Sequence, residues 1–424
     1  MAEVNVETLQ AALAGLLHDI GKFAQRAGIR PRESFDYDTR KEVNYEHALL
    51  SYDFAQEYAA GLTEEVRQAV GRLVYHHVPQ TDADDRLRLA DWLAAGERHE
   101  TEEAQPGPPL PLMRSVFSQL HGFEEPWYVS LKRLRFDEDT LFPVRLDDTV
   151  QQTDHQPSYE ALWQEFTAAC APLKTTSDPV VFLETLYNRL LEFTWCVPSA
   201  YYHAVPDVSL FDHCRMTAAV AACLAVDGRD GTWCRAVADE QPAATLVAGD
   251  ISGVQDFIYT LASSGAAKTL RGRSFNIQLL TEVVADFILH RLGLPITNLL
   301  YAGGGTFFLL AGVSQQVQLE GLGCEVSQRL VAAHRGALHL TLAWKSVERG
   351  EFRRGGFSEV WRQLHEDCLL PQKYRPLAAL PAEELFAVVG TPQGAGGDTD
   401  QTCSVCGAER QKGEHFETEE AGAE

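Results

Sequence analysis

The sequence predicts a multidomain α+β protein with three parts: a helical metal-binding unit, a ferredoxin-like unit, and an incomplete zinc-binding segment. Three observations lead to this prediction. Histidine and aspartate recur on successive apolar helices near the start, strands and helices alternate as β-α-β-β-α-β from residue 243, and a Cys-x-x-Cys pair follows near the end.

The composition is that of a globular protein. The 424 residues suffice for two or three domains, and 45% hydrophobic and 23% charged residues are ordinary values. No apolar run is long enough to span a membrane, the first residues are acidic, unlike a signal peptide, and most cysteines are scattered. We therefore expect a cytoplasmic protein with no membrane partner and no disulfide framework.

The net charge of −24 argues against a general nucleic-acid coat, because phosphate binding needs basic surface. A nuclease remains possible, since metal ions or a basic partner subunit can neutralise phosphate locally.

Shifts in composition suggest four regions, with a charged loop expected at 36–41 and a proline-rich linker at 101–111. They are a helical metal-binding unit at 1–105, a mostly helical connecting region at 106–242, the ferredoxin-like unit at 243–390, and a linker with the partial zinc-binding segment at 391–424.

Four predicted helices of the first region each offer histidine or aspartate side chains. Asn44 is expected to cap the second helix and Thr63 the third. Imidazole nitrogen and carboxylate donors together suit a divalent ion that binds phosphate and activates water. The candidate ligands are His18, Asp19, His47, His76, His77 and Asp91.

Some of these assignments have a simpler alternative. A single buried histidine is usually a hydrogen-bonded core residue, and either His76 or His77 could face solvent. Lys22 could hold a phosphate or could be the solvated end of a helix. The recurrence on four apolar helices nevertheless favours a metal site, with His18, Asp19 and Lys22 as the catalytic candidates.

The motifs His18-Asp19-x-Gly-Lys, His47-x-x-x-Ser, His76-His77 and Ala90-Asp91 resemble the HD phosphohydrolase superfamily. Their order, and the run from Ala90 to Arg98, resemble the HD nuclease of the large signature subunit of type III-A CRISPR effector complexes. The resemblance implies cleavage of single-stranded DNA with a divalent transition metal (Mn, Ni or Co) or Mg.

The resemblance also implies a division of the ligands. Asp19 would bridge two ions, His18 and Asp91 would hold one, and the other three histidines would hold the second. Many HD domains have a further histidine upstream of the His-Asp pair, but none precedes His18 here. The first ion would then be one donor short or completed by water.

In the connecting region we expect a few short strands within 112–148, helix over 159–196 and an alanine-rich helix over 217–226. The run from Pro206 to His213 contains two acids and a histidine and could be a second metal cluster. We favour a structural role, in which Pro206 and Asp207 form a turn and Asp212 caps the next helix.

The last large region has the elements of a ferredoxin-like unit, the plan of nucleotide polymerase and cyclase palm domains. We expect strands at 244–248, 298–301, 306–311 and 337–344, helices at 254–261, 274–292 and 315–333, and turns at 249–253 and 302–305.

A catalytic palm needs carboxylates at the end of its first strand and on the hairpin between its second and third. Asp250 occupies the first place, but Gly305 and Thr306 stand where hairpin acids would be. Such a palm should bind a nucleotide or a partner without catalysing transfer. The glycines could also simply supply positive φ angles to a hairpin.

The runs 249–258, 270–275 and 301–305 resemble the first, degenerate palm of the same CRISPR subunit. In that family a second palm carries Gly-Gly-Asp-Asp and makes cyclic oligoadenylates from ATP. The resemblance implies ATP contacts at Asp250, Ser252, Gly303, Gly304 and Gly305. The nearest such string, at 396–399, is expected to be a flexible linker.

Cys403 and Cys406 form half of a zinc site, and only His415 follows as a further ligand. In the family a second cysteine pair and the second palm come next. The chain therefore resembles the front half of a larger subunit: a fragment, a truncated gene product or one piece of a split subunit.

The leading hypothesis is a metal-dependent single-strand deoxyribonuclease that acts with other type III-A CRISPR subunits, guide RNA and target RNA. One alternative is an HD phosphohydrolase of small nucleotides. The other is a scaffold subunit in which both sites are inert.

Overall fold

The computed structural model describes residues 5–33, 41–96, 110–119, 127–145, 154–201, 205–236, 238–259, 266–334, 336–353, 355–373, 382–383 and 386. Most of the expected charged loop at 36–41 and of the linker at 101–111 lie outside these residues. The string at 396–399, Cys403, Cys406 and His415 do so as well.

The first region is helical, as predicted. Its helices are α1 (Val6–Leu17), α2 (Ile20–Arg26), α4 (Glu46–Tyr58), α5 (Glu64–Gly71), the 3-10 turn η1 (Arg72–Tyr75) and α6 (Asp82–Ala95). Thr63 is the N-cap residue of α5, as predicted, although its side chain makes no capping bond. The prediction for α4 is wrong by one residue, because Tyr45 rather than Asn44 is its N-cap.

The connecting region contains short strands and several helices. They are η2 (Val116–Gln119), β1 (Trp127–Tyr128), α7 (Glu138–Leu141), β2 (Val144–Arg145), α9 (Gln156–Ala169), η3 (Ala171–Thr175), α10 (Pro179–Thr194), α11 (Leu210–Val226) and α12 (Gly231–Arg235). The expected helix over 159–196 is interrupted between α9 and α10. Pro179 begins α10 behind its cap Asp178, since proline has no N–H to continue the preceding helix.

Helix α11 begins at Leu210, well before the predicted Thr217, because Ser209 caps it. The Ser209 hydroxyl accepts a hydrogen bond of 2.9 Å from the backbone N–H of Asp212. The prediction that Asp212 caps this helix is therefore wrong; Asp212 lies in the first turn.

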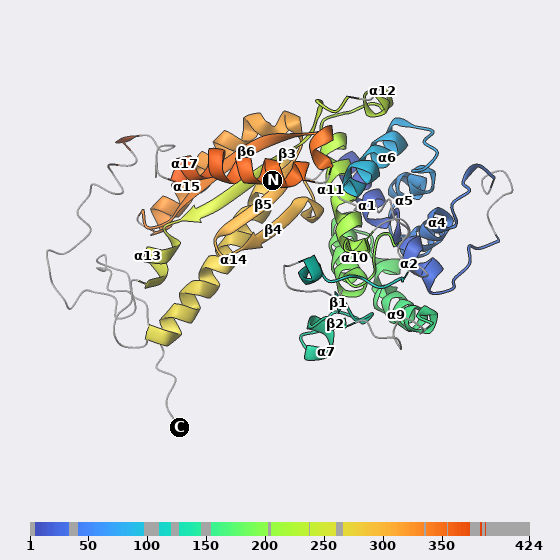
Figure 1. The fold of residues 1–424 in the computed structure, drawn as a ribbon. Coiled ribbons are helices and arrows are strands. Elements are labelled where there is room, and N and C mark those ends of the chain that lie inside the picture. Colours follow the sequence, from blue (N-terminus) through green and yellow to red (C-terminus); the bar gives the residue numbers. More distant parts are fainter. Residues whose placement is uncertain are drawn as a thin grey trace.

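A four-stranded antiparallel sheet forms the other half of the molecule, at the left of Figure 1. Its elements are β3 (Pro242–Ser252), α13 (Val254–Tyr259), α14 (Ala266–Leu292), η4 (Ile296–Asn298), β4 (Leu299–Gly303), β5 (Thr306–Ala311), η5 (Val313–Gln315), α15 (Gln316–His334) and β6 (His339–Glu348). After β6 come η6 (Arg349–Phe352), α16 (Gly356–Gln363), the π-helical turn η7 (Leu364–Leu369) and α17 (Leu370–Lys373).

The strand order β4-β5-β3-β6, with α13 and α14 before β4 and α15 before β6, is the ferredoxin-like order expected from the sequence. One detail differs. The expected turn at 249–253 is wrong for its first four residues, because Gly249 to Ser252 continue β3 in register with β6. Asp250 thus lies inside the strand, opposite Thr306 of β5.

Helix α11 joins the two halves (Figure 1). One hydrophobic cluster contains Leu89 of α6, Leu224 of α11, Leu246 of β3 and Phe308 of β5. A buried amide reinforces this core: the Asn298 Nδ2 donates to the carbonyl of Ala219 on α11 at 3.1 Å and to that of Leu310 on β5 at 2.9 Å. The helical half therefore packs directly on the sheet.

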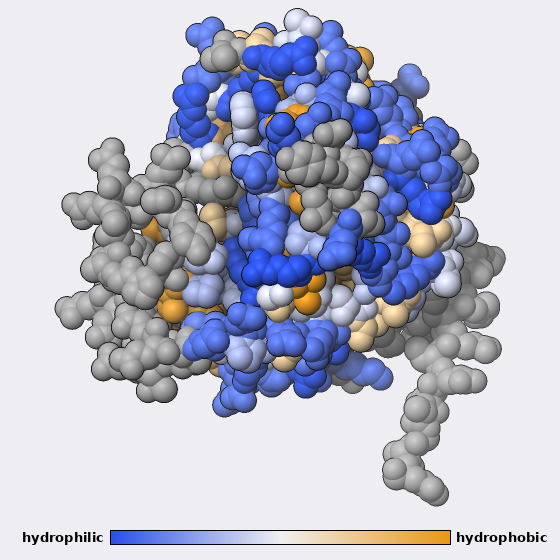
Figure 2. All heavy atoms as spheres, turned by 90° about the vertical axis from the view of Figure 1, so that its right-hand side faces the viewer, coloured by the Kyte–Doolittle hydropathy of each residue, from blue (hydrophilic) through white to orange (hydrophobic). Residues whose placement is uncertain are grey.

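The face of the helical half shown in Figure 2 is mainly hydrophilic, with small separate apolar spots. Among the described residues, no helix is both long and apolar enough to cross a membrane.

Candidate metal centre

The structure gathers the predicted ligands into two adjoining groups of metal-type donors. Within each group the donor atoms lie within 4.8 Å of one another. The first group is His18, Asp19, Asp91 and His213, and the second is His47, His76 and His77.

Asp19 connects the two groups through its two carboxylate oxygens. Its Oδ2 lies 3.3 Å from His18 Nε2 and 3.2 Å from His213 Nε2, both in the first group. Its Oδ1 lies 3.6 Å from His47 Nε2 in the second group. One carboxylate thus faces both donor sets, an arrangement suited to a bridging ligand.

His213 is the member of the site that sequence reasoning missed. Its Nε2 lies 3.1 Å from Asp91 Oδ1, and its side chain is buried. The turn and cap role expected for the run from Pro206 to His213 is thus only part of what this segment does, because His213 also joins the donors. His213 stands in the donor group that lacked an upstream histidine, although it comes much later in the chain.

A sequence signal for this contact exists in the small residues of the helices. A Cβ added to Gly15 of α1 would lie 2.5 Å from the Cα of Ala218 on α11. The alanine-rich stretch of α11 is therefore the surface by which it approaches α1 closely, and this approach brings His213 beside His18.

Backbone carbonyls orient two of the buried imidazoles. His18 Nδ1 lies 2.8 Å from the carbonyl of Gly15, and His76 Nδ1 lies 2.6 Å from that of Leu73. These bonds favour the tautomer with hydrogen on Nδ1, so each Nε2 can present a lone pair. Both Nε2 atoms are buried. His76 Nε2 makes no hydrogen bond among the described residues, whereas His18 Nε2 faces the carboxylates of Asp19 and Asp91. A metal ion would give both nitrogens a partner.

Burial sets the charge of the second group. It lowers the pKa of His47 to about 4, against the opposing effect of Asp19, and that of His76 to about 3. It also lowers the pKa of His77. These imidazoles are neutral near pH 7, and only the neutral ring coordinates a metal.

The first group has the opposite electrostatics. Burial lowers the pKa of His18, but its ion pair with Asp19 and its bonds to neighbouring groups outweigh this effect and raise it well above the usual value. Burial raises the pKa of Asp91, but hydrogen bonds to His18 and His213 hold it well below the usual range. His18 thus favours its protonated form beside ionised carboxylates, and a metal ion bound here would displace the proton on Nε2.

The turn that presents His18 and Asp19 is fixed by Ser51 of α4. Its hydroxyl donates to the carbonyl of His18 at 2.7 Å and accepts from the N–H of Gly21 at 2.9 Å. A Cβ on Gly21 would lie only 1.9 Å from the carbonyl oxygen of His47. The glycine therefore allows α2 to approach α4 closely enough for the two donor groups to adjoin.

Access to the centre is from the side of the second group. His18, His76 and His213 are buried, whereas His77 is partly exposed and the His47 side chain is 16% exposed. Lys22 is partly exposed as well, and its Nζ lies 2.5 Å from Asp19 Oδ2.

The palm-like residues lie together at one end of the sheet. Ser252 donates to Asp250 Oδ1 at 3.3 Å, and Lys373 of α17 forms an ion pair with the same oxygen at 2.7 Å. Gly304 and Gly305 have φ angles of +62° and +93° in the β4–β5 hairpin, so glycine is needed there by the turn itself.

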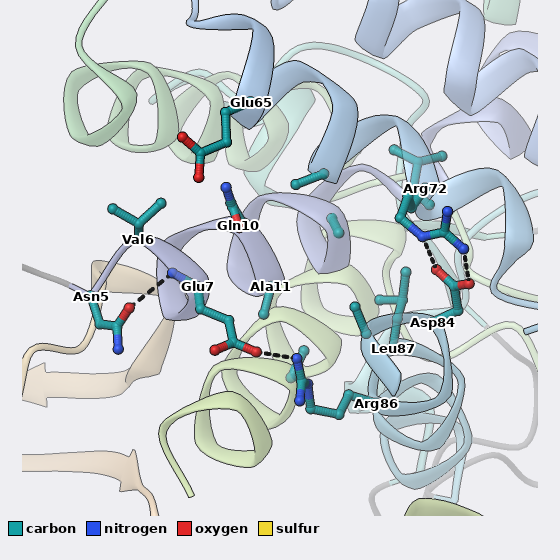
Figure 3. A pocket seen from close by; sticks show the side chains of 15 residues that line it. Asn5, Val6, Glu7, Gln10, Ala11, Glu65, Arg72, Asp84, Arg86 and Leu87 are labelled. Atoms are coloured by element: carbon teal, nitrogen blue, oxygen red, sulfur yellow. Dashed lines mark hydrogen bonds and ion pairs between the residues drawn. The ribbon is translucent and has the colours of Figure 1, made fainter. Parts of the chain in front are cut away.

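A separate pocket of about 450 Å³ lies between α1, α5 and α6. Figure 3 shows its charged rim, in which Arg72 pairs with Asp84 and Arg86 pairs with Glu7. The two donor groups do not line it, although its wall includes Leu73, whose carbonyl orients His76.

Two family models match the chain. The HD domain matches residues 2–96, and Csm1 subunit domain B matches residues 243–389. The donor groups come mainly from the first match, and the sheet belongs to the second.

Similar proteins bear one name. A protein of Methanocaldococcus jannaschii named CRISPR system single-strand-specific deoxyribonuclease Cas10/Csm1 (subtype III-A) is 29% identical over 403 residues, 84% of this chain and 48% of the relative. A protein of Thermococcus onnurineus with the same name is 31% identical over 382 residues, 83% of this chain and 45% of the relative. The chain spans about half the length of these relatives.

Solved structures that contain Csm1 are similar to this chain as well. The crystal structure of Csm1 in T. onnurineus is 26% identical, with a TM-score of 0.61 over 88% of this chain and 50% of that chain. A Csm1–Csm4 cassette in complex with cA4 is 25% identical, with a TM-score of 0.60 over 90% of this chain and 50% of that chain.

Proposed function

The chain belongs to the Cas10/Csm1 family of type III-A CRISPR subunits, and on this premise we propose that its helical half is a metal-dependent nuclease for single-stranded DNA. The observation that carries the proposal is the pair of donor groups that Asp19 connects. The name shared by the relatives supports the substrate class.

The donor chemistry fits divalent transition metals. The second group offers three imidazole nitrogens, and the first offers two imidazoles and two carboxylates. Imidazole suits transition metals such as Ni or Co, whereas Mg prefers oxygen ligands, and the carboxylates of the mixed set can also hold Mn. Bound here, such ions would polarise a phosphodiester and lower the pKa of an attacking water.

The side chains have separate tasks in this proposal. Asp19 holds the two donor groups at a fixed distance, and the carbonyls of Gly15 and Leu73 keep the buried imidazoles aimed inward. Lys22 lies at the accessible side and provides a cation that can pair with a phosphate oxygen of the substrate. Because phosphate oxygens are common to all nucleic acids, this pairing sets position rather than sequence.

The test is cleavage of labelled single-stranded DNA by the purified chain with Mn²⁺, beside the variant His18→Ala/Asp19→Ala. We expect cleavage by the wild type, little on duplex DNA, and a loss of at least about 100-fold in the double variant. Equal cleavage by both proteins would refute the proposal. Hydrolysis of free nucleotides without DNA cleavage would instead favour the small-nucleotide phosphohydrolase.

For the sheet we propose ATP binding in a site shared with a second palm domain. Asp250, Ser252 and the glycine hairpin would contact the nucleotide. Two features support the shared site: β4 is an edge strand with Tyr301 exposed, and α14 exposes a stripe of apolar side chains. That stripe is Phe275, Leu279 and Val283. Because the hairpin lacks an acid, incubating this chain with ATP should yield no cyclic oligoadenylate.

The remaining assignments follow the family. We propose that the chain acts in a complex with other type III-A subunits, guide RNA and target RNA, and the Csm1–Csm4 structures support a neighbouring subunit.

We also propose the boundaries near 105, 242 and 390, and half of a zinc site at Cys403 and Cys406. Zinc content of the purified chain, compared with Cys403→Ser, tests the last point.

A further inference from the structure

We propose that Tyr45 is a base-stacking residue that helps the metal centre select single-stranded DNA. The inference rests on the proposed nuclease function and names a side chain that contacts the substrate. Tyr45 was not among the residues singled out from the sequence.

The first argument is location. Tyr45 is the N-cap residue of α4 and is separated from the donor His47 by one residue. Its ring centroid lies 4.0 Å from that of His77 and 5.8 Å from that of His47. Since His47 and His77 are partly exposed donors, Tyr45 lies on the accessible side of the centre.

The second argument is exposure. The ring of His77 also contacts that of His76, with 3.9 Å between ring centroids, so Tyr45 belongs to a cluster of rings with the two histidines. Tyr45 is 46% exposed, the most of the three. Burying an aromatic ring is favourable, so one left half exposed beside a reactive centre is available to another flat ring.

The third argument concerns the choice between single-stranded and duplex DNA. A nucleobase that stacks on Tyr45 would bring its own phosphate near the donor groups and Lys22. In a duplex both faces of each internal base are covered by neighbouring bases, so only an unpaired, unstacked base can use the tyrosine. Stacking on a ring is tolerant of sequence, which suits a nuclease without a fixed recognition site.

The experiment compares a single-stranded oligonucleotide with one of equal length that carries abasic sites. The wild type should have a KM about 5- to 150-fold lower for the normal strand, the range expected for one base–aromatic stack. Tyr45→Ala should raise the KM for the normal strand and so abolish the difference, whereas Tyr45→Phe should keep it. Trp92→Ala, which removes another exposed aromatic ring of the helical half, serves as the matched control and should behave as the wild type.

Binding measured in the His18→Ala/Asp19→Ala background separates this inference from the nuclease proposal, because it needs no cleavage. The preference for the normal strand should persist there and disappear when Tyr45→Ala is added. A preference that survives Tyr45→Ala would overturn the inference. So would an equal loss on both strands, because Tyr45 would then only support His77, or a loss in Tyr45→Phe as large as in Tyr45→Ala.

Discussion

At the residue scale, the centre depends on two histidine donors whose Nδ1 atoms are already hydrogen-bonded to the backbone. The carbonyls of Gly15 and Leu73 hold Nδ1 of His18 and His76, so rotation of either ring would break a buried hydrogen bond. His18 and His76 therefore hold their Nε2 atoms toward the centre without an ion. This reduces the entropic cost of ordering the two side chains when an ion binds.

The first prediction concerns His213. Replacing His213 by alanine should lower Mn²⁺ affinity by at least about 100-fold, because loss of a direct ligand should exceed the 10- to 100-fold effect of outer residues. DNA cleavage should fall with it. Metal titration by calorimetry and cleavage assays measure both effects.

The control for this prediction is His290→Ala, which removes an exposed histidine from α14. It should retain both metal affinity and cleavage. If His213→Ala binds Mn²⁺ as tightly as this control, His213 is a buried core residue and not a ligand.

At the element scale, close helix contacts place the donors. Helix α2 approaches α4 at Gly21, and α1 approaches α11 at Gly15. In both contacts the absence of a side chain allows one backbone to reach the other, and larger residues would separate the helices that carry the two donor groups.

The second prediction follows from the α2–α4 contact. Gly21→Ala should destabilise the protein by about 1–3 kcal/mol, the usual cost of overpacking, and should weaken Mn²⁺ binding because His47 is displaced. Urea unfolding and metal titration measure these changes.

Gly321→Ala in α15 provides the comparison, because nothing lies within 4 Å of its added Cβ. Alanine is the better helix former, so this variant should gain about 0.5–1 kcal/mol. A Gly21→Ala protein with unchanged stability would show that α2 and α4 can separate without consequence.

At the scale of the whole molecule, the metal centre and the sheet share one structural element. Helix α11 carries His213 in its first turn, and two residues later Arg215 donates to the carbonyl of Leu300 in β4 at 3.1 Å. Together with Asn298 and the common hydrophobic cluster, this contact ties the helical half to the sheet.

The third prediction is that both halves unfold in one transition that metal shifts as a whole. Mn²⁺ at about 100 times its Kd should add about 2.7 kcal/mol, provided that the ion binds only the folded state. Far-UV circular dichroism and intrinsic tryptophan fluorescence, to which Trp361 beside Phe308 of the sheet contributes, should report the same midpoint.

The variant His18→Ala/Asp19→Ala should lose the Mn²⁺ shift. Two separate transitions, only one of which responds to Mn²⁺, would contradict the coupling through α11. Asn298→Ala, which removes the buried amide between α11 and β5, should lower the shared midpoint without removing the metal response.

Local sequence determined much of this protein. The apolar periodicity of the first region predicted its helices, and the alternation after residue 243 predicted every strand of the sheet, with β5 matching the prediction at both ends. Six of the donors could be proposed as well, because each stands beside its own helix signal. The strand ends were less certain, since β3 continues past Gly249 only because β5 and β6 pair with it.

Only the tertiary structure decided which residues meet. His213 is far from His18 in the chain, and its neighbourhood contains ordinary turn and cap residues, so no local pattern distinguishes a ligand from a structural histidine. The close approach of α11 to α1, which small side chains permit and a shared core stabilises, brings it to Asp19 and Asp91. The sequence predicted the kind of centre; long-range packing determined its complete donor set and its attachment to the sheet.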